Sequence, residues 1–467
     1  MASIKRSVNA TEGPLFSKMI LFAIPLMLTN IMQQLYSMAD NIVVGKFSGD
    51  PLALAAVGST GTLTAMITHL FVGFSSGCAV VVAQSYGSKD EKTLSRGVHT
   101  SMVFALCAGL FFCALGLLIS RPALIMLDTK PEILEKAIMY FRIICLGIPA
   151  TAIYNFGASV LRSIGDSKTP LYTLSASGIA NVGLNLIFVI VFKMSIAGVA
   201  IATITAQYIS AVAVMYVLIK RKNEPYAFSF SKFKLHKETL IRVLRLGVPA
   251  AVQGSLFSIT NLCLIRALNS FPTPVVSART IATSIDVILS TAINSYLHVT
   301  MTFTGQNFGA KKFDRIKKTV LYSALQVAVF GFVVGQIMII FYKPLVGLYL
   351  AADDPYRAEV LVAAKTIMTV MLSTYFIGAI HESFSGALRG LGYSIYPMFT
   401  SIGCIVVFRM FWIFVVFPLL DSLVGLYLIY PISWSLSVIA LSCMIAYAMK
   451  KIRRAQVEEL TPAESKN

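Results

Sequence analysis

The segment Leu161-Arg-Ser-Ile-Gly-Asp-Ser-Lys-Thr-Pro170 has a counterpart 227 positions later, Leu388-Arg-Gly-Leu-Gly-Tyr-Ser-Ile-Tyr-Pro397. Three further matches keep nearly the same spacing and the same order along the chain: Gln84-Ser-Tyr-Gly87 with Gln306-Asn-Phe-Gly309, Pro25 with Pro249, and Gly198 with Gly425. Ordered self-similarity at one offset indicates two copies of a structural unit. We therefore predict a duplicated fold.

The composition places both copies in a lipid bilayer. Of 467 residues, 57% are hydrophobic and only 13% are charged, whereas soluble chains carry roughly a quarter charged residues. A helix needs about 20 apolar residues to cross a hydrocarbon core of about 30 Å, and such runs recur from end to end. The formal net charge is +18, and the basic residues lie between the apolar runs. This placement indicates that they set the orientation of the protein in the membrane and contact lipid headgroups, and that they do not bind nucleic acid.

The apolar runs predict an all-α integral membrane protein with twelve transmembrane helices in two pseudo-symmetric six-helix bundles. The bundles are residues 1–219 and 246–449, with a cytoplasmic linker at 220–245 and a cytoplasmic tail at 450–467. Lys and Arg concentrate in loops on one side, so both termini are expected to be cytoplasmic. The predicted helices are 15–45, 52–83, 98–119, 138–161, 171–192, 196–219, 246–268, 273–303, 319–341, 360–388, 395–417 and 423–449.

An even number of helices per copy makes the repeats parallel, related by an axis along the membrane normal. Parallel repeats with a central cavity are typical of transporters, whose substrate site lies between the halves near the bilayer midplane. A duplication that serves only the stability of a large scaffold is the alternative.

Polar side chains inside the first bundle are few. A charged side chain at the bilayer centre costs at least roughly 2.5 to 3.5 kcal/mol, yet Asp40 stands in an apolar run, fifteen positions after a proline, Pro25, that can kink the helix. Asn181 and Asn185 share one helix face, and Thr203 follows on the next helix. Their oxygens suit a small cation or a proton relay, although amides and hydroxyls also serve simply as contacts between helices.

The repeat helps to choose between these roles. At the local offsets, Asp40 corresponds to Leu264 and Thr203 to Tyr430, while the two asparagines correspond to Phe408 and Trp412. Residues needed only to hold a six-helix unit together should persist in its second copy, and none does. The difference favours a functional role.

The second half has a polar set of its own: Arg266, Arg279, Asp286, Glu382 and Arg409. We consider these residues candidates for binding substrate or protons. Arg266 and Asp286 could instead form a structural ion pair, and Glu382 could be a satisfied buried acid. The cysteines and histidines lack metal-ligand spacing, so no metal site is predicted beyond a Na⁺ at Asp40, Asn181, Asn185 and Thr203.

Over essentially its whole length the chain resembles the multidrug and toxic compound extrusion (MATE) transporters, nearer their prokaryotic DinF-like branch. The matching motifs are Ala39-Asp-Asn-Ile-Val-Val-Gly45, Ala83-Gln-Ser-Tyr-Gly87, the two Leu-Arg-x-x-Gly elements and Asn181-x-x-x-Asn185. The resemblance implies a first-bundle cation site at Asp40, Asn181, Asn185 and Thr203, with Asn185 standing where that branch has a second acid. Another branch has acids on helices 7 and 10; these positions are Phe257 and Glu382 here.

The resulting hypothesis is a secondary antiporter that exports organic, often cationic, lipophilic compounds in exchange for H⁺ or Na⁺ by alternating access, with Asp40 as the coupling residue. We expect a monomer in the cell membrane, with small organic molecules and lipid as its partners and no cofactor. The alternative is a flippase for a lipid-linked precursor, whose pyrophosphate would seek the arginines of the second half. The sequence shows no nucleotide-binding or catalytic motif, so an enzyme is not expected.

Overall fold

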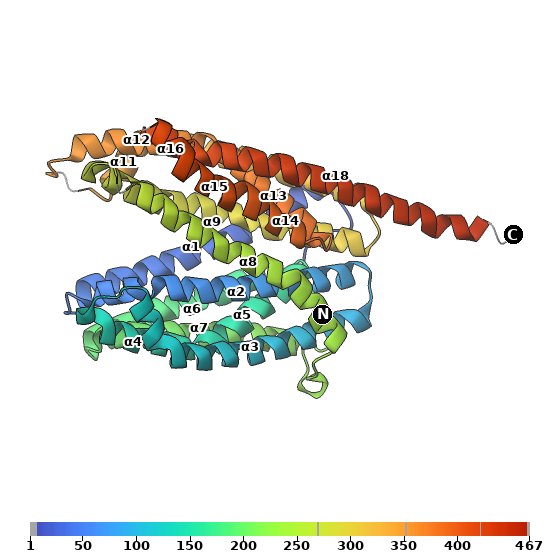
Figure 1. Ribbon diagram of the computed structural model, residues 1–467. Coiled ribbons are helices and arrows are strands. Elements are labelled where there is room, and N and C mark those ends of the chain that lie inside the picture. Colours follow the sequence, from blue (N-terminus) through green and yellow to red (C-terminus); the bar gives the residue numbers. More distant parts are fainter. Residues whose placement is uncertain (1–6, 269, 351–352, 421, 465–467) are drawn as a thin grey trace. The chain divides into compact units, whose positions relative to one another are not determined.

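The computed structural model describes residues 7–268, 270–350, 353–420 and 422–464, apart from the side chains of 257–263, 266 and 455–464. Throughout this part of the chain the regular structure is helical (Figure 1). The first six spans are α1 (Leu15–Phe47), α2 (Ala53–Gly87), α3 (Glu91–Met126), α4 (Pro131–Leu146) with α5 (Ile148–Ser163), α6 (Lys168–Leu186) with the π-helix η1 (Ile187–Val191), and α7 (Ser195–Lys220).

A short 3₁₀ helix, η2 (Phe230–Lys232), precedes the remaining spans. These are α8 (Lys237–Leu268), α9 (Thr273–Gly309), α10 (Phe313–Ile340) with α11 (Tyr342–Gly347), and α12 (Arg357–Ser373) with α13 (Tyr375–Gly390). They end with a segmented span of α14 (Ile395–Thr400), η3 (Ser401–Val407), α15 (Phe408–Phe411), η4 (Trp412–Val416) and α16 (Phe417–Leu420), followed by α17 (Leu423–Tyr427) and α18 (Ile429–Glu464).

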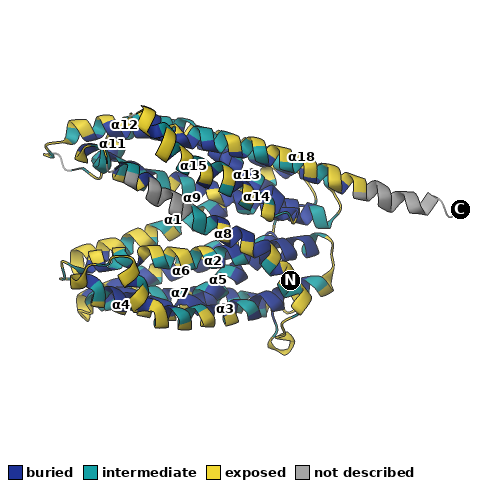
Figure 2. Cartoon of the chain, in the orientation of Figure 1, coloured by how far each residue is buried: buried dark blue, intermediate teal, exposed yellow. Residues whose placement is uncertain are grey.

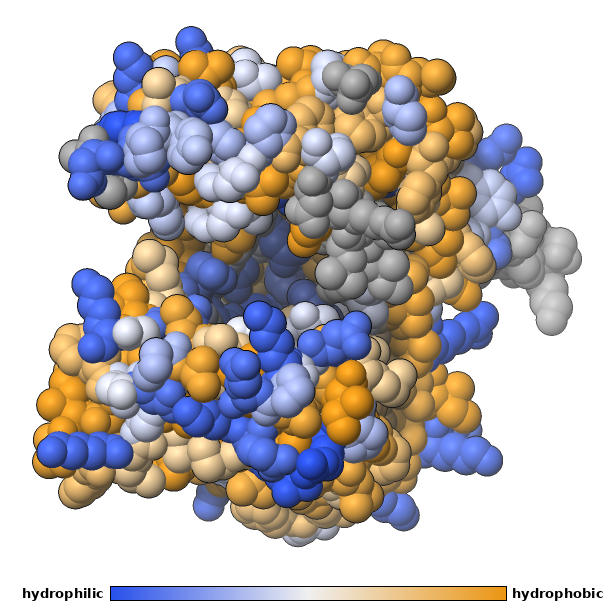
Figure 3. Space-filling model, turned by 60° about the vertical axis from the view of Figure 1, so that its left-hand side comes forward, coloured by the Kyte–Doolittle hydropathy of each residue, from blue (hydrophilic) through white to orange (hydrophobic). Residues whose placement is uncertain are grey.

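The helices have the length and apolarity of membrane spans. Among the described residues, nine are long and apolar enough to cross a bilayer, and two bent pairs bring the number to eleven. α8, part of which lies outside the described side chains, is the twelfth long segment. Apolar residues cover much of the surface seen in Figure 3, as expected of a protein solvated by lipid.

Two predicted helices, 138–161 and 360–388, are wrong as continuous spans. The first is bent by 44° between α4 and α5, and the second by 42° between α12 and α13. Gly147 caps α4 and Pro149 stands in the first turn of α5; proline supplies no amide hydrogen to continue the helix. At the other break, Thr374 donates its hydroxyl to the carbonyl of Val370. Apolarity continues across both breaks, so the sequence pattern hides them.

The observed connection after α7 is shorter than the predicted linker at 220–245, because α8 already begins at Lys237. The remaining linker lies against α3. His99 accepts a hydrogen bond from the Ser229 amide through Nε2 at 3.0 Å and its ring stacks on Phe228. The hydroxyl of Thr100 accepts a bond from the amide of His236.

The chain divides into two compact units, Met1–Ser255 with Gln306–Lys312, and Leu256–Gly305 with Phe313–Asn467. This division falls inside α8, and the predicted domain boundary in the linker stays a prediction. In the first unit α5 packs against α2, α3 and α7, and its buried residues show as dark blue in Figure 2. Ser159 and Ser163 on α5 donate to the carbonyls of Ser75 and Ala79 on α2, so small polar residues hold the two helices together.

The short segment Gln306–Lys312 belongs to the first unit because its backbone meets α2 directly. A Cβ added at Gly87 would overlap the carbonyl of Gln306, and one added at Gly309 would overlap the carbonyl of Gln84. The repeated Gln-x-x-Gly motifs therefore pack reciprocally against each other. The N-terminal segment covers this contact, with Ala10 donating its amide to Gln306 Oε1 at 3.1 Å.

Candidate functional site

Asp40 on α1 receives hydrogen bonds on both carboxylate oxygens from two other helices of the first unit. Asn185 on α6 donates its Nδ2 to Oδ1 at 2.5 Å. Thr203 on α7 donates its hydroxyl to Oδ2 at 3.1 Å. Residues far apart in the sequence thus converge on one carboxylate, as their polarity in apolar helices suggested.

The two asparagines lie one turn apart on α6. Asn185 Nδ2 is also 3.4 Å from Asn181 Oδ1, and both residues are buried. Among the described residues, Oδ1 of Asn185 has no hydrogen-bond donor, which leaves a buried acceptor beside the carboxylate. Directly after this position α6 becomes the π-helix η1; such turns are frequent at functional sites.

Thr203 has two acceptors for a single hydroxyl proton. Besides Asp40, the carbonyl of Val199 lies 2.9 Å from its Oγ1. When the proton points to Val199, the hydroxyl oxygen can present a lone pair to a bound cation. The site can therefore act as a donor to a bare carboxylate or as a ligand to a metal ion.

Tyr140 on α4 also belongs to this environment and was missed by sequence reasoning. It is buried, interacts electrostatically with Asp40, and shares an apolar cluster with Val44 and Val199. A tyrosine in an apolar helix resembles ordinary core, so no sequence signal distinguished it. The apolar cluster lowers the local dielectric and strengthens each polar interaction of Asp40.

Pro25 lies inside α1, which continues through it as one helix. A proline cannot donate to the carbonyl four residues before it, here that of Leu21. Thr29 donates its hydroxyl to the carbonyl of Pro25 at 2.6 Å. The predicted kink at Pro25 stays a prediction. Its structural basis is the backbone hydrogen bond that α1 lacks at this proline.

The candidates of the second half all lie in the second unit. Arg279 and Asp286 on α9 interact electrostatically, and Asp286 also interacts with Tyr375. Glu382 on α13 interacts with Arg389 of the same helix, and Arg409 lies on α15. The side chain of Arg266 lies outside the described residues, so its predicted pairing with Asp286 stays a prediction.

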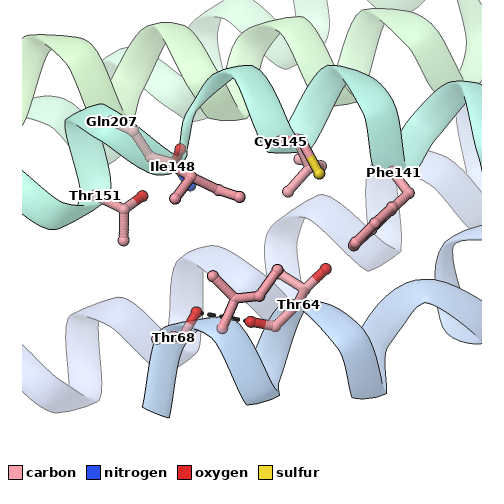
Figure 4. A pocket seen from close by; sticks show the side chains of 9 residues that line it. Thr64, Thr68, Phe141, Cys145, Ile148, Thr151 and Gln207 are labelled. Atoms are coloured by element: carbon pink, nitrogen blue, oxygen red, sulfur yellow. Dashed lines mark hydrogen bonds between the residues drawn. The ribbon is translucent and has the colours of Figure 1, made fainter. Parts of the chain in front are cut away.

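A small cavity of about 30 Å³ lies apart from Asp40 in the first unit (Figure 4). This is room for a water-sized molecule. Gln207 on α7 lines it, and its Oε1 has no donor among the described residues. Hydroxyls from α2 and α5 complete the polar part of the wall, and the lining is Thr64, Ile67, Thr68, Phe141, Ile144, Cys145, Ile148, Thr151 and Gln207.

The repeated apolar helices define a multi-pass membrane protein with the duplicated architecture of transporters. The chain belongs to the MatE family, whose model matches residues 25–187 and 249–415. It is 27% identical to "Probable multidrug resistance protein YoeA" of Bacillus subtilis, over 84% of this chain and 85% of that protein. It is 30% identical to "Probable multidrug resistance protein YpnP" of the same organism, over 67% and 69%.

Solved structures confirm the predicted fold. "Crystal structure of MATE in complex with MaD3S" matches with a TM-score of 0.85 at 20% identity, covering 97% of this chain and all of that one. "Outward-facing conformation of a multidrug resistance MATE family transporter of the MOP superfamily" matches with a TM-score of 0.84 at 21% identity, covering 98% and 100%. The family resemblance is thereby confirmed, and none of these relatives supports a flippase.

Proposed function

We propose that this transporter exports organic, often cationic, lipophilic compounds in exchange for H⁺ or Na⁺, with Asp40 as the coupling group. The observation that carries the proposal is the convergence of Asn185 and Thr203 on both oxygens of Asp40. The multidrug names of YoeA and YpnP support the substrate class.

The chemistry of the site accommodates either coupling ion. For Na⁺, the hard ligands are the carboxylate, the hydroxyl of Thr203 and the amide oxygens of Asn181 and Asn185. For H⁺, a protonated Asp40 becomes a donor, and the amide of Asn185 can turn its oxygen towards it. Either event removes a negative charge from an apolar surrounding, so it changes the free energy of this part of the helix bundle.

Pro25 connects loading of the site to a change in shape. The turn of α1 around Pro25 lacks one backbone hydrogen bond, so bending there costs less than elsewhere in the helix. Two similar solved structures, "Crystal structure of MATE in the bent conformation" and "Crystal structure of MATE in the straight conformation", each match with a TM-score of 0.84. We infer that ion loading shifts the population between such states, and that substrate export follows by alternating access.

Asp286 and Glu382 have a subordinate place in this proposal, as second-unit acids that exchange protons or contact substrate. Arg266, Arg279 and Arg409 would contact substrate there. The rest of the proposal is a monomer in the cell membrane with both termini cytoplasmic, no cofactor and no nucleic-acid partner.

Transport in proteoliposomes under separately imposed pH and Na⁺ gradients tests the proposal. Uptake of ethidium, a lipophilic cation, should follow one gradient in the native protein and lose that dependence in Asp40→Asn. Asp128→Asn is the matched control, because Asp128 is exposed and its positive φ of 52° suits asparagine. Gradient-driven transport that persists unchanged in Asp40→Asn would contradict the role of Asp40.

A further inference from the structure

A cluster of arginine and aromatic side chains lies in the second unit at the repeat position of the Asp40 site. By the offset of 227, Thr203 corresponds to Tyr430, and Arg409 stands one residue after the counterpart of Asn181. The guanidinium of Arg409 lies over the ring of Tyr430, 4.5 Å from its centroid. The first unit gathers acceptor oxygens around a carboxylate, whereas the second gathers cations in the same place.

Arg409 keeps donors available despite its burial. It is only 6% exposed, and its Nε donates to the hydroxyl of Ser433 at 3.1 Å. Within the described part of the chain, its two Nη groups have no hydrogen-bond acceptor and no carboxylate lies within ion-pair distance. A buried guanidinium without an acceptor for part of its planar fork is well suited to bind a carboxylate or phosphate in a bidentate manner.

A second cation adjoins the first. Nη1 of Arg279 donates to the hydroxyl of Tyr427 at 3.1 Å, and the ring of Tyr427 stacks on Tyr430. The two guanidinium groups interact electrostatically as like charges. Among the described residues, the acid that interacts with this pair is Asp286, through Arg279. Two cations with one anion leave a net positive charge in a membrane-embedded unit, which is costly unless another anion joins them.

The local backbone and the neighbouring rings also favour a binding site. Arg409 stands on a four-residue α-helical piece, α15, between the π-helices η3 and η4, and π-helical turns are frequent at functional sites. The ring of Trp434 lies 5.4 Å from Tyr430 and 5.2 Å from Tyr375. Such rings provide apolar, polarisable contacts for a planar organic molecule.

We propose that Arg409 and Arg279, with the aromatic side chains around them, bind the carboxylate or phosphate group of an aromatic organic anion or zwitterion. The binding itself is independent of the proposed export function. Only the further step, that the bound molecule is a transported substrate, rests on that function. The inference extends the substrates of this transporter to compounds that carry an acidic group.

Tryptophan fluorescence provides the test, since the chain has only two tryptophans and Trp434 lies in the cluster. The full-length protein carrying Trp412→Phe is titrated in a neutral detergent with benzoate, phenyl phosphate, inorganic phosphate, dihexanoyl-phosphatidylglycerol and uncharged benzamide. We expect saturable changes with benzoate and phenyl phosphate, and none with benzamide. Arg409→Gln should weaken benzoate binding at least tenfold, and Arg121→Gln, which alters an exposed arginine in the first unit, should not change it.

Other outcomes overturn the inference. Equal binding of benzamide, or benzoate binding that Arg409→Gln leaves unchanged, would show that the guanidinium does not recognise the ligand. Binding of phosphatidylglycerol alone would make this a lipid site, and binding of inorganic phosphate alone a site for a free ion. If Arg409→Gln does not fold, the titration is repeated with Arg409→Lys and Arg279→Gln. Each should bind benzoate at least fivefold more weakly than the protein with both arginines. Asp40→Asn should bind benzoate normally, so failure of ion coupling remains distinguishable.

Discussion

Thr203 lies 3.1 Å from Oδ2 of Asp40, and its hydroxyl can turn from that carboxylate to the carbonyl of Val199. One proton thus serves two acceptors on different helices. Removing the Thr203 hydroxyl should weaken ion binding without destabilising the fold, because Thr203 is one of several contacts between α7 and α1.

Thr203→Ala should weaken the apparent affinity for the coupling ion, while Thr203→Ser should retain it. A hydrogen bond to a charged group contributes about 1.5 kcal/mol or more, which corresponds to roughly a tenfold change. The measurement is ethidium transport in proteoliposomes as a function of the coupling ion's concentration. An alanine variant that matches the native affinity would show that the hydroxyl takes no part in coupling.

Asn185→Asp should increase the number of ions exchanged per substrate molecule. The substitution places a second carboxylate within hydrogen-bond distance of Asp40, where Asn185 now donates. Two adjacent carboxylates do not both stay ionised, so the pair should hold an additional proton or cation. Parallel measurement of ion and substrate flux gives the ratio, and Asn155→Asp on α5, which lies outside this hydrogen-bonded group, is the control. An unchanged ratio would argue that Asp40 is not part of the exchange.

The reciprocal glycine contact predicts two sensitive positions. Gly87→Ala and Gly309→Ala would each push a methyl group into a backbone carbonyl, of Gln306 and Gln84 respectively. Overpacking against atoms that cannot move costs about 1 to 3 kcal/mol, so thermal unfolding in detergent should occur at lower temperature. Gly61→Ala, with no atom within 4 Å of the added Cβ, should be neutral or stabilising because alanine favours the helix.

An ion pair between the loop that joins α1 to α2 and helix α4 predicts a pH dependence. Lys136 Nζ lies 2.5 Å from Oδ2 of Asp50, and this hydrogen bond lowers the pKa of the Asp50 carboxyl from its usual 3.8. A carboxylate with a lowered pKa stabilises the fold above the unfolded-state pKa and loses that effect as the pH falls through its own value. The lysine therefore contributes fully near pH 7, and its contribution decreases as the pH falls below about 3.9, the ordinary pKa of an aspartate.

Unfolding of Lys136→Met at pH 7 and pH 3 measures this effect. At pH 7 the substitution should cost about 0.2 to 1 kcal/mol, the usual range for an ion pair near the surface, and at pH 3 it should cost less. Lys130→Met removes an exposed lysine directly before α4, the helix that carries Lys136, and controls for net charge. An equal cost at pH 3 and pH 7 would assign the effect to packing of the lysine side chain.

The sequence allowed the Asp40 site to be predicted because polarity in a membrane helix is expensive and therefore conspicuous. Asp40, Asn185 and Thr203 each stand out in an apolar run, and the missing counterparts in the second repeat single them out. Tyr140 could not be found this way, since an aromatic residue in an apolar helix looks like core. Its place beside Asp40 depends on how α4 packs, which is a tertiary property.

The breaks at Gly147 and Thr374 were hidden for a related reason. Hydropathy records how apolar a run is, and it does not change when the helix axis turns within the membrane. The arginine cluster was only partly predictable: Arg279 and Arg409 were conspicuous by charge, but their position over Tyr427 and Tyr430 arises from the packing of the last helices. Periodicity therefore predicts the spans, and packing decides which polar groups meet.

The linker after α7 yields the last prediction. His99 donates from Nδ1 to the carbonyl of Ser95 at 2.7 Å while its Nε2 accepts from the amide of Ser229, so the neutral ring joins α3 to the linker. His99→Leu removes both bonds and the stacking on Phe228. The bond to Ser95 lies within α3, so opening of the linker breaks only the bond to Ser229 and the ring contact. One hydrogen bond of about 1 kcal/mol corresponds to roughly a fivefold rise in the open population.

Limited trypsin digestion measures that opening, because Lys222, Lys232 and Lys234 are exposed in the linker. Cleavage of His99→Leu should be faster than that of the native protein, and Ser101→Ala, two residues further on α3, should be cut at the native rate. Since proteolysis of a transiently opened segment follows its open population, equal rates for His99→Leu and native protein would mean that the histidine does not hold the linker. The same digestion reports topology: cleavage in inside-out vesicles but not in right-side-out vesicles is expected if this linker faces the cytoplasm, and the reverse pattern would invert the predicted orientation of every span.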